Sequence, residues 1–171
     1  PDHKNPINDY LIGGESKERL RIGLEEIIAN KISYLSIKEQ NQNRPAEKFE
    51  NNTLATNIEE NLPFSLTPDQ KKSYQEIAED MASGTPMLRL LQGDVGSGKT
   101  IVAALIAAHV VEDQKQVVIL APTTILANQH YESFCEWYGD NENIVLHTSK
   151  LPVKEKREIY QKKREGVVKI I

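Results

Sequence analysis

The chain has 171 residues, of which 39% are hydrophobic and 27% charged, enough for one ordinary domain with an appended segment. A net charge of −4 argues against a surface that binds nucleic acid everywhere, and no apolar run is long enough to span a bilayer. The single cysteine, Cys135, excludes an internal disulfide, and no stretch has the pattern of a signal peptide. We therefore expect a cytoplasmic protein without membrane contact, in which Cys135 is a small buried residue.

Residues 1–40 predict a polar, turn-rich loop followed by a long amphipathic helix. Apolar residues recur at helical spacing from about residue 15 to residue 40. They are Leu20, Leu24, Ile27, Ile28, Ile32 and Leu35. Residues 41–61 are rich in Asn and Glu and predict a linker that includes a short helix around residues 54–62, so a domain boundary is expected there.

A second helix is predicted to begin at Thr67 and to end near Gly84. Proline is tolerated at the first helical position, which Pro68 fills. Gln70 stands three residues after Thr67, the spacing of a capping box.

The strongest motif follows a short strand-like run over residues 87–91 and precedes helical residues 101–112. It fills the pattern G-x-x-x-x-G-K-[ST] with Gly93, Asp94, Val95, Gly96, Ser97, Gly98, Lys99 and Thr100. Glycines let the backbone N–H groups converge on a phosphate, and the helix that starts here adds its positive end. Lys99 can reach the outer phosphates of a nucleotide, and the Thr100 hydroxyl can ligate Mg²⁺. The alternative is a glycine-rich turn without a ligand.

The rest of the chain alternates between strands and helices. Strands are predicted over residues 116–121 (buried), 143–147 and 167–171, and helices over 125–138 and 151–164. This alternation predicts an α/β fold, a parallel sheet with helices on both faces. Because the last strand runs to residue 171, we expect an incomplete domain over residues 62–171.

The charge is uneven along the chain. Residues 150–171 hold eight Lys or Arg and three Asp or Glu, a balance of +5, which leaves −9 for the remainder. The basic side chains of the predicted helix could contact DNA electrostatically. They are Lys154, Lys156, Arg157, Lys162, Lys163 and Arg164. Glu155 and Glu158 interleave with them, which favours a solvated helix face instead.

Several of these stretches together resemble the RecG family of superfamily 2 helicases. The resemblance covers residues 66–70, 86–104 and 121–130, and residues 19–40 resemble the family's segment between its DNA-binding wedge domain and its motor. The related motor of transcription–repair coupling factors shares residues 93–96, but usually has an aromatic residue at the position of Ser97 and tends to have Cys at Gln92. The resemblance to RecG is therefore favoured.

The resemblance implies the first part of a RecA-like motor domain in an ATP-driven translocase that remodels branched double-stranded DNA, such as stalled forks and four-way junctions, in recombination and repair. Residues 93–100 would bind ATP and Mg²⁺, and Gln70 would read the adenine edge with Phe64 and Leu66 packing nearby. Pro122, Thr123 and Gln129 would touch the DNA backbone. The structural alternatives are helix capping for Gln70, and a turn with a packed helix for the DNA-contacting group.

ATP hydrolysis in this family needs a D-E-x-H motif and arginines from a second motor domain, and the sequence holds no D-E-x-H. We expect a monomeric fragment that binds nucleotide weakly and neither hydrolyses ATP usefully nor unwinds DNA. Two other classes stay open: an adaptor that binds nucleotide without hydrolysing it, and a P-loop kinase. Gln70 and the turn at residues 122–124 disfavour the kinase, which needs neither.

Overall fold

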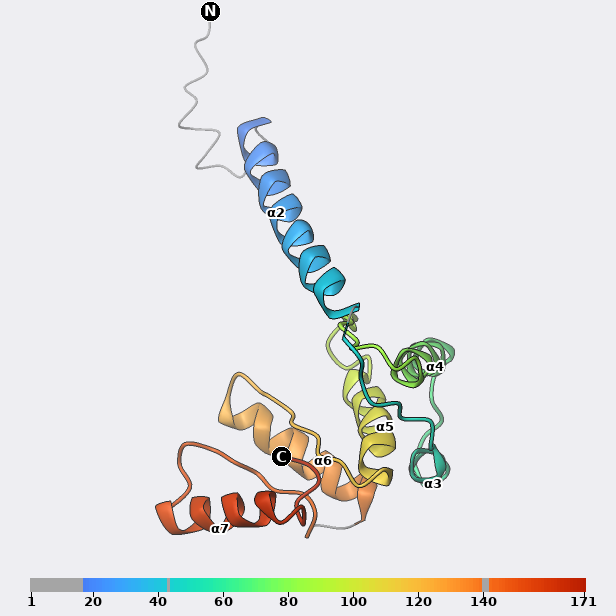
Figure 1. Ribbon diagram of the computed structural model, residues 1–171, viewed down its shortest axis with the longest axis vertical. Helices are drawn as coiled ribbons and strands as arrows, with labels where there is room; N and C mark the ends of the chain where they lie inside the picture. Colours follow the sequence, from blue (N-terminus) through green and yellow to red (C-terminus); the bar gives the residue numbers. More distant parts are fainter. Residues whose placement is uncertain (1–16, 43, 140–141) are drawn as a thin grey trace, which may run out of the picture. The chain divides into compact units, whose positions relative to one another are not determined.

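The computed structural model describes residues 17–42, 44–139 and 142–171 (Figure 1). It divides into two compact units, residues 1–45 and residues 46–171, and each is described by itself. The loop expected over residues 1–14 lies outside the described residues.

The described part of the first unit is a single helix, α2 (Lys17–Gln42), close to the predicted bounds. Its apolar side chains are exposed, among them Ile27 at 67%. The prediction of an amphipathic helix is wrong, because apolar residues do not gather on one face: Ile22 and Ile37 fall away from the predicted stripe, and Lys31 falls within it. None of the described helices is long and apolar enough to cross a membrane.

The second unit contains five described helices, each within three residues of its expected start. They are α3 (Thr53–Glu60), α4 (Pro68–Ala82), α5 (Lys99–Glu112), α6 (Thr124–Tyr138) and α7 (Val153–Arg164). Both halves of the predicted capping box of α4 are present: Thr67 Oγ1 accepts from the Gln70 N–H, and Gln70 Oε1 accepts from the Thr67 N–H. This reciprocal pair fixes where α4 begins.

The apolar helix α5 lies at the centre of the core (Figure 1). Leu105 and Ala108 are fully buried, and both α3 and α4 pack on α5. From α6, Phe134 enters the same core and the Tyr138 hydroxyl donates to the Ala104 carbonyl at 2.8 Å. Cys135 packs against this core but is half-buried rather than buried as expected. The position of α5 is therefore set by apolar contacts along its length.

No extended strand is assigned within the described ranges. Two isolated parallel bridges join Ile170 to Val117 and to Ile144, so the segment ending at residue 171 lies between the other two. The backbone supports this order, because the Ile119 N–H donates to the Ile171 carbonyl at 2.8 Å and the Val145 N–H donates to the Ile170 carbonyl at 2.9 Å. The bridges have the predicted direction, whereas the complete sheet stays a prediction.

The segment at residues 116–121 is not the buried strand that the sequence predicted. Val118 is 60% exposed and Leu120 is 89% exposed, whereas Val117 and Ile119 pack against the core. Successive side chains of an extended segment point to opposite sides. The described residues cover only one of the two sides.

Candidate functional site

The loop at residues 93–98 curls tightly because of its glycines. Gly96 and Gly98 have φ angles of +81° and +78°, in the left-handed region that glycine adopts without strain. At Gly93, an added Cβ would stand only 2.7 Å from Ser97 Oγ, so a side chain there would collide with the other end of the loop. The two ends of the loop therefore lie close together, with the Ser97 hydroxyl next to the Gly93 backbone.

The loop delivers the chain to the start of α5, where no side chain caps the helix. Gly98 is the N-cap residue and offers no hydroxyl or amide, whereas Thr67 and Thr123 cap α4 and α6. The first N–H groups of a helix have no carbonyl partner within it, and they mark its positive end. The N-terminus of α5 is therefore suited to an anion.

The Lys99 ammonium lies over the loop. Its Nζ donates to the Gly93 carbonyl at 2.9 Å and to the Asp94 carbonyl at 2.7 Å, and lies 3.4 Å from Ser97 Oγ. No carboxylate forms an ion pair with Lys99 in the part of the chain that the structure describes. Thr100, next along the helix, is half-buried. The donor set and the glycine cradle fit a nucleotide's phosphates with Mg²⁺.

Gln70 connects the start of α4 to this loop. While its Oε1 accepts from Thr67, its Nε2 donates to the Ser97 carbonyl at 2.9 Å. A Cβ at Gly98 would collide with Gln70 Nε2, so the third glycine of the motif also makes room for this contact. The sequence predicted the cap but missed the tie to Ser97, which joins residues 27 positions apart.

A hollow of about 350 Å³ lies between the start of α4 and the loop. Its walls bring Gln70 and Lys99 together with three of the loop residues, Gly93, Ser97 and Gly98. This arrangement places one amide side chain beside the glycine loop and the start of α5, within a hollow that is open to solvent.

The two other predicted adenine contacts lie elsewhere. Phe64 is 46% exposed and lines a second hollow of about 510 Å³, between α3 and the start of α4. Leu66 is buried in the core and does not line the hollow beside the loop, so its packing near an adenine stays a prediction. Gln70 is therefore the predicted adenine contact that shares a hollow with the loop.

The residues predicted to touch DNA lie on the turn before α6 and on its first turns. Thr123 is the N-cap residue, and its Oγ1 accepts from the Leu126 N–H at 3.3 Å. Pro122 and Gln129 are exposed. The helix-capping role of Thr123 is thus observed, while Pro122 and Gln129 face solvent.

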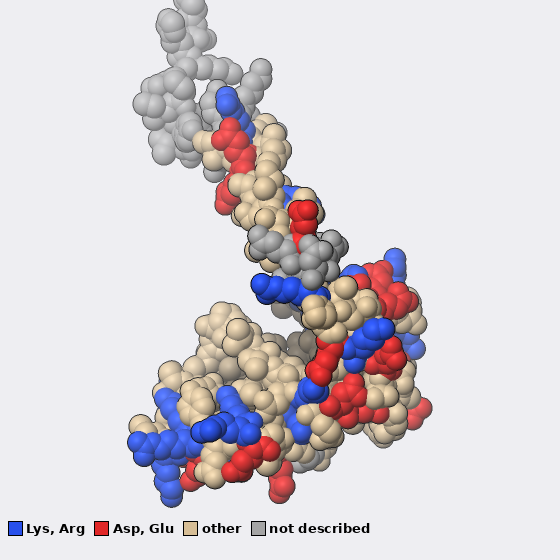
Figure 2. All heavy atoms as spheres, viewed as in Figure 1, with Lys and Arg blue, Asp and Glu red and all other residues tan. Residues whose placement is uncertain are grey.

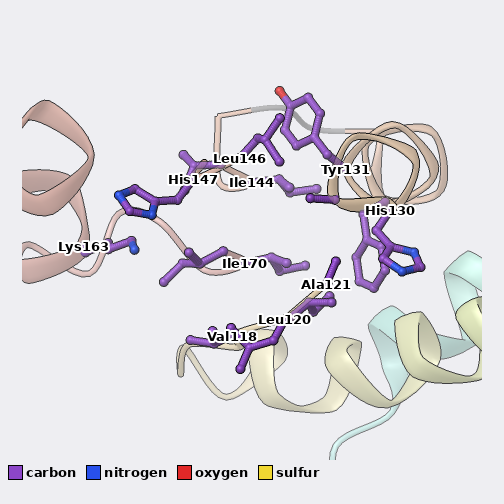
Figure 3. A pocket seen from close by; sticks show the side chains of 15 residues that line it. Val118, Leu120, Ala121, His130, Tyr131, Ile144, Leu146, His147, Lys163 and Ile170 are labelled. Atoms are coloured by element: carbon purple, nitrogen blue, oxygen red, sulfur yellow. The ribbon is translucent and has the colours of Figure 1, made fainter. Parts of the chain in front are cut away.

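A third hollow, of about 240 Å³, was not foreseen from the sequence (Figure 3). Apolar side chains from three extended segments and α6 line it, including Val118, Leu120 and Ile144. His130 and His147 also stand in its wall. The lining is more strongly apolar than that of the hollow beside the loop.

The core behind the site holds a titratable pair made of the buried His109 and the half-buried Tyr74. His109 of α5 is 3% exposed, and its Nε2 lies 2.8 Å from the hydroxyl of Tyr74 on α4. Burial lowers the pKa of His109, although the nearby Glu112 and Asp113 act in the opposite direction. Burial also raises the pKa of Tyr74, so both groups are neutral near pH 7.

Residues 67–171 match the DEAD/DEAH box helicase family, and the chain belongs to that family. The match includes the phosphate loop, the uncapped start of α5 and the turn before α6. It shows a RecA-like helicase fold at the level of the family.

The chain is similar to ATP-dependent DNA helicase RecG. It is 46% identical over 113 residues to RecG of Aquifex aeolicus (strain VF5), covering 66% of this chain and 14% of that protein. RecG of Escherichia coli (strain K12) is 42% identical over 134 residues, covering 78% of this chain and 19% of that protein. The chain therefore spans less than a fifth of the length of these two relatives.

Two further proteins bear on this similarity. A solved structure of RecG bound to a three-way DNA junction superposes with a TM-score of 0.75 at 36% identity, covering 89% of this chain and 21% of that one. The transcription-repair-coupling factor of Staphylococcus aureus (strain USA300) is 41% identical over 142 residues, covering 81% of this chain and 12% of that protein.

Proposed function

We propose that this chain is the ATP-binding part of a RecG-type motor that translocates on double-stranded DNA and remodels branched DNA. The observation that carries the proposal is the arrangement at the start of α5: an uncapped helix end, a glycine loop and the Lys99 ammonium, tied to α4 by Gln70. Identity to RecG above 40% over 113 and 134 residues of the chain supports it.

The main-chain N–H groups of the loop and of the first turn of α5 hold the β- and γ-phosphates. Lys99 exchanges the carbonyl oxygens of Gly93 and Asp94 for phosphate oxygens when nucleotide binds. The Thr100 hydroxyl ligates Mg²⁺, which neutralises phosphate charge. Gln70 reads the adenine edge from the hollow that it shares with the loop.

The DNA backbone contacts Pro122, Thr123 and Gln129 at the start of α6. Phosphate contacts of this kind position the protein on DNA without reading its sequence. The full domain is a parallel sheet with helices on both faces, and the bridges at Ile170 support its central register. The bare side, on which Val118 and Leu120 stand, is the side that further helices cover in the full domain.

Since the 171 residues contain no D-E-x-H motif, the chain binds nucleotide weakly and does not by itself hydrolyse ATP usefully. The whole protein's helicase activity, its branched-DNA substrates and its monomeric, cytoplasmic state belong to this proposal as well.

A coupling-factor motor is the second candidate, because the Staphylococcus aureus protein is 41% identical over a similar share of the chain. Ser97 and Gln92 favour the RecG type. The two candidates share the phosphate site, so they differ in partners rather than in nucleotide chemistry.

The test is a titration of the chain with a fluorescent ATP analogue and Mg²⁺, comparing wild type with Lys99→Ala. Loss of charge-assisted hydrogen bonds worth about 1.5–3 kcal/mol corresponds to an affinity about 10- to 100-fold lower. Lys72→Ala removes an exposed lysine of α4 as the control and should leave the affinity unchanged. Equal affinities of wild type and Lys99→Ala would refute the phosphate site.

A further inference from the structure

Helix α7 carries an unusual concentration of positive charge. Six of its 12 residues are Lys or Arg, two are Glu, and none of its residues is buried. Figure 2 shows these basic side chains gathered over α7, at the lower left of the view. Such a helix is held to the protein by its inner side only.

The inner side of α7 is anchored by polar and aromatic contacts. Gln116 Nε2 donates to the Lys163 carbonyl at 2.9 Å, near the end of the helix, and Lys156 Nζ donates to the Ser149 carbonyl at 2.9 Å. The rings of His147 and Tyr160 lie 5.6 Å apart. Lys156 and Lys163 are half-buried on this side, so they are not the freely presented charges.

The outer side presents a basic stripe of three residues, Lys154, Arg157 and Arg164, with Gln161 between them. Spacings of three, four and three residues place all four on one helix face, and all four are exposed. The stripe is about 15 Å long at 1.5 Å per residue, which is about the axial rise of four phosphates along one DNA strand.

The acidic residues that interleave in the sequence are separated from this stripe by the helix. At 100° per residue, Glu155 turns well away from the stripe, and Glu158 borders one edge of it beside Lys154. The ion pairs of the described residues use Arg21, Lys71, Arg89 and Lys115, and none involves α7. The sequence pattern favoured a solvated helix face, and the stripe is indeed exposed, with its charge left out of the ion pairs of the described residues.

We propose that the basic stripe binds the phosphate backbone of double-stranded DNA, as a contact additional to that of residues 122–129. The inference rests on the proposed function as a DNA motor and names a second surface for its substrate. Guanidinium and ammonium groups at this spacing contact phosphates without reading bases. The exposed large apolar side chains of α7 are Val153 and Tyr160, too few for the apolar face with which helices enter membrane surfaces.

The stripe variant Lys154→Gln, Arg157→Gln, Arg164→Gln tests the proposal. Its control is Arg44→Gln, Lys48→Gln, Lys72→Gln, which removes the same charge from exposed positions outside α7. Binding to a labelled 20-base-pair duplex is followed by fluorescence anisotropy from 50 to 200 mM salt.

Each phosphate contact contributes about 0.9 to the slope of log affinity against log salt concentration. Loss of three contacts should make that negative slope shallower by up to about 2.7. Over this fourfold salt range, the affinity of the variant should therefore fall about 40-fold less than that of wild type. The control should keep the wild-type slope. A charge-retaining variant, Lys154→Arg, Arg157→Lys, Arg164→Lys, should keep it as well, and circular dichroism confirms that all variants fold.

Equal slopes for wild type and the stripe variant would refute DNA binding by the stripe and would leave the proposed nucleotide site unaffected. Absence of wild-type binding to duplex at 50 mM salt would also overturn it, and the Lys99 titration would still judge the proposed function separately. Co-sedimentation with phosphatidylserine vesicles in preference to duplex would assign the stripe to a membrane and reject the proposal.

Discussion

The double role of the Gln70 side chain can be separated by two substitutions. Its Oε1 accepts from the Thr67 N–H at 2.8 Å, and its Nε2 donates to the Ser97 carbonyl at 2.9 Å. Gln70→Ala removes both contacts, whereas Gln70→Glu keeps the acceptor and removes the donor. The two variants therefore distinguish helix capping from the tie to the phosphate loop.

A hydrogen bond of this kind contributes about 0.5–1.5 kcal/mol net, so Gln70→Ala should lower the free energy of unfolding by about 1–3 kcal/mol. Glutamate suits the third position of a capping box and the first turn of a helix. Gln70→Glu should therefore cost about 1 kcal/mol or less in urea unfolding. Its carboxylate then faces the Ser97 carbonyl and lies beside the hollow in which we propose that the phosphates bind.

We therefore expect Gln70→Glu to bind the fluorescent ATP analogue at least as weakly as Gln70→Ala while being the more stable of the two. Gln75→Glu makes the same change at an exposed position further along α4 and should leave nucleotide binding unchanged. If Gln70→Glu binds nucleotide as wild type does, the tie to Ser97 has no influence on the site and our reasoning fails.

Two further predictions concern the core that positions α5. Burial lowers the pKa of His109 below 6.5, so near that pH the unfolded chain binds a proton at this residue more readily than the folded chain does. The free energy of unfolding should therefore fall as the pH drops through 6.5, by up to about 1.4 kcal/mol per pH unit. Urea unfolding at pH 7.5 and 5.5 should show that this loss of stability is smaller in His109→Gln than in wild type and is unchanged in His130→Gln. If the loss in His109→Gln equals that of wild type, the pH dependence does not come from His109. Tyr138→Phe leaves the Ala104 carbonyl without its hydroxyl donor and should lower the free energy of unfolding by about 1–2 kcal/mol, measured by urea unfolding at pH 7.5, with Tyr160→Phe as an exposed control. No measurable loss in Tyr138→Phe would mean that this hydrogen bond does not help to hold α6 on α5.

The features that could be predicted from the sequence are local ones. The cap of α4 and the glycine loop depend on residues within eight positions of one another, so their spacing in the sequence determines their geometry. The boundaries of the five helices in the second unit follow from the same short-range signals.

Contacts between distant residues could not be predicted in this way. The tie from Gln70 to Ser97 and the pair of His109 with Tyr74 depend on how α4 lies beside α5, which no local pattern encodes. The exposure of Leu120 was missed for a related reason. An apolar run is typical of a strand that is covered on both sides, but the run itself does not tell whether both covering layers are present.

The resting place of the Lys99 ammonium has a consequence for nucleotide exchange. Because the loop's own carbonyl oxygens solvate this cation at 2.7 and 2.9 Å, departure of the proposed nucleotide would leave no bare charge behind. When a nucleotide binds, the Lys99 ammonium would exchange the carbonyl oxygens of Gly93 and Asp94 for phosphate oxygens. The affinity that Lys99 would supply at the proposed site is thus a difference between two solvated states, which keeps it moderate.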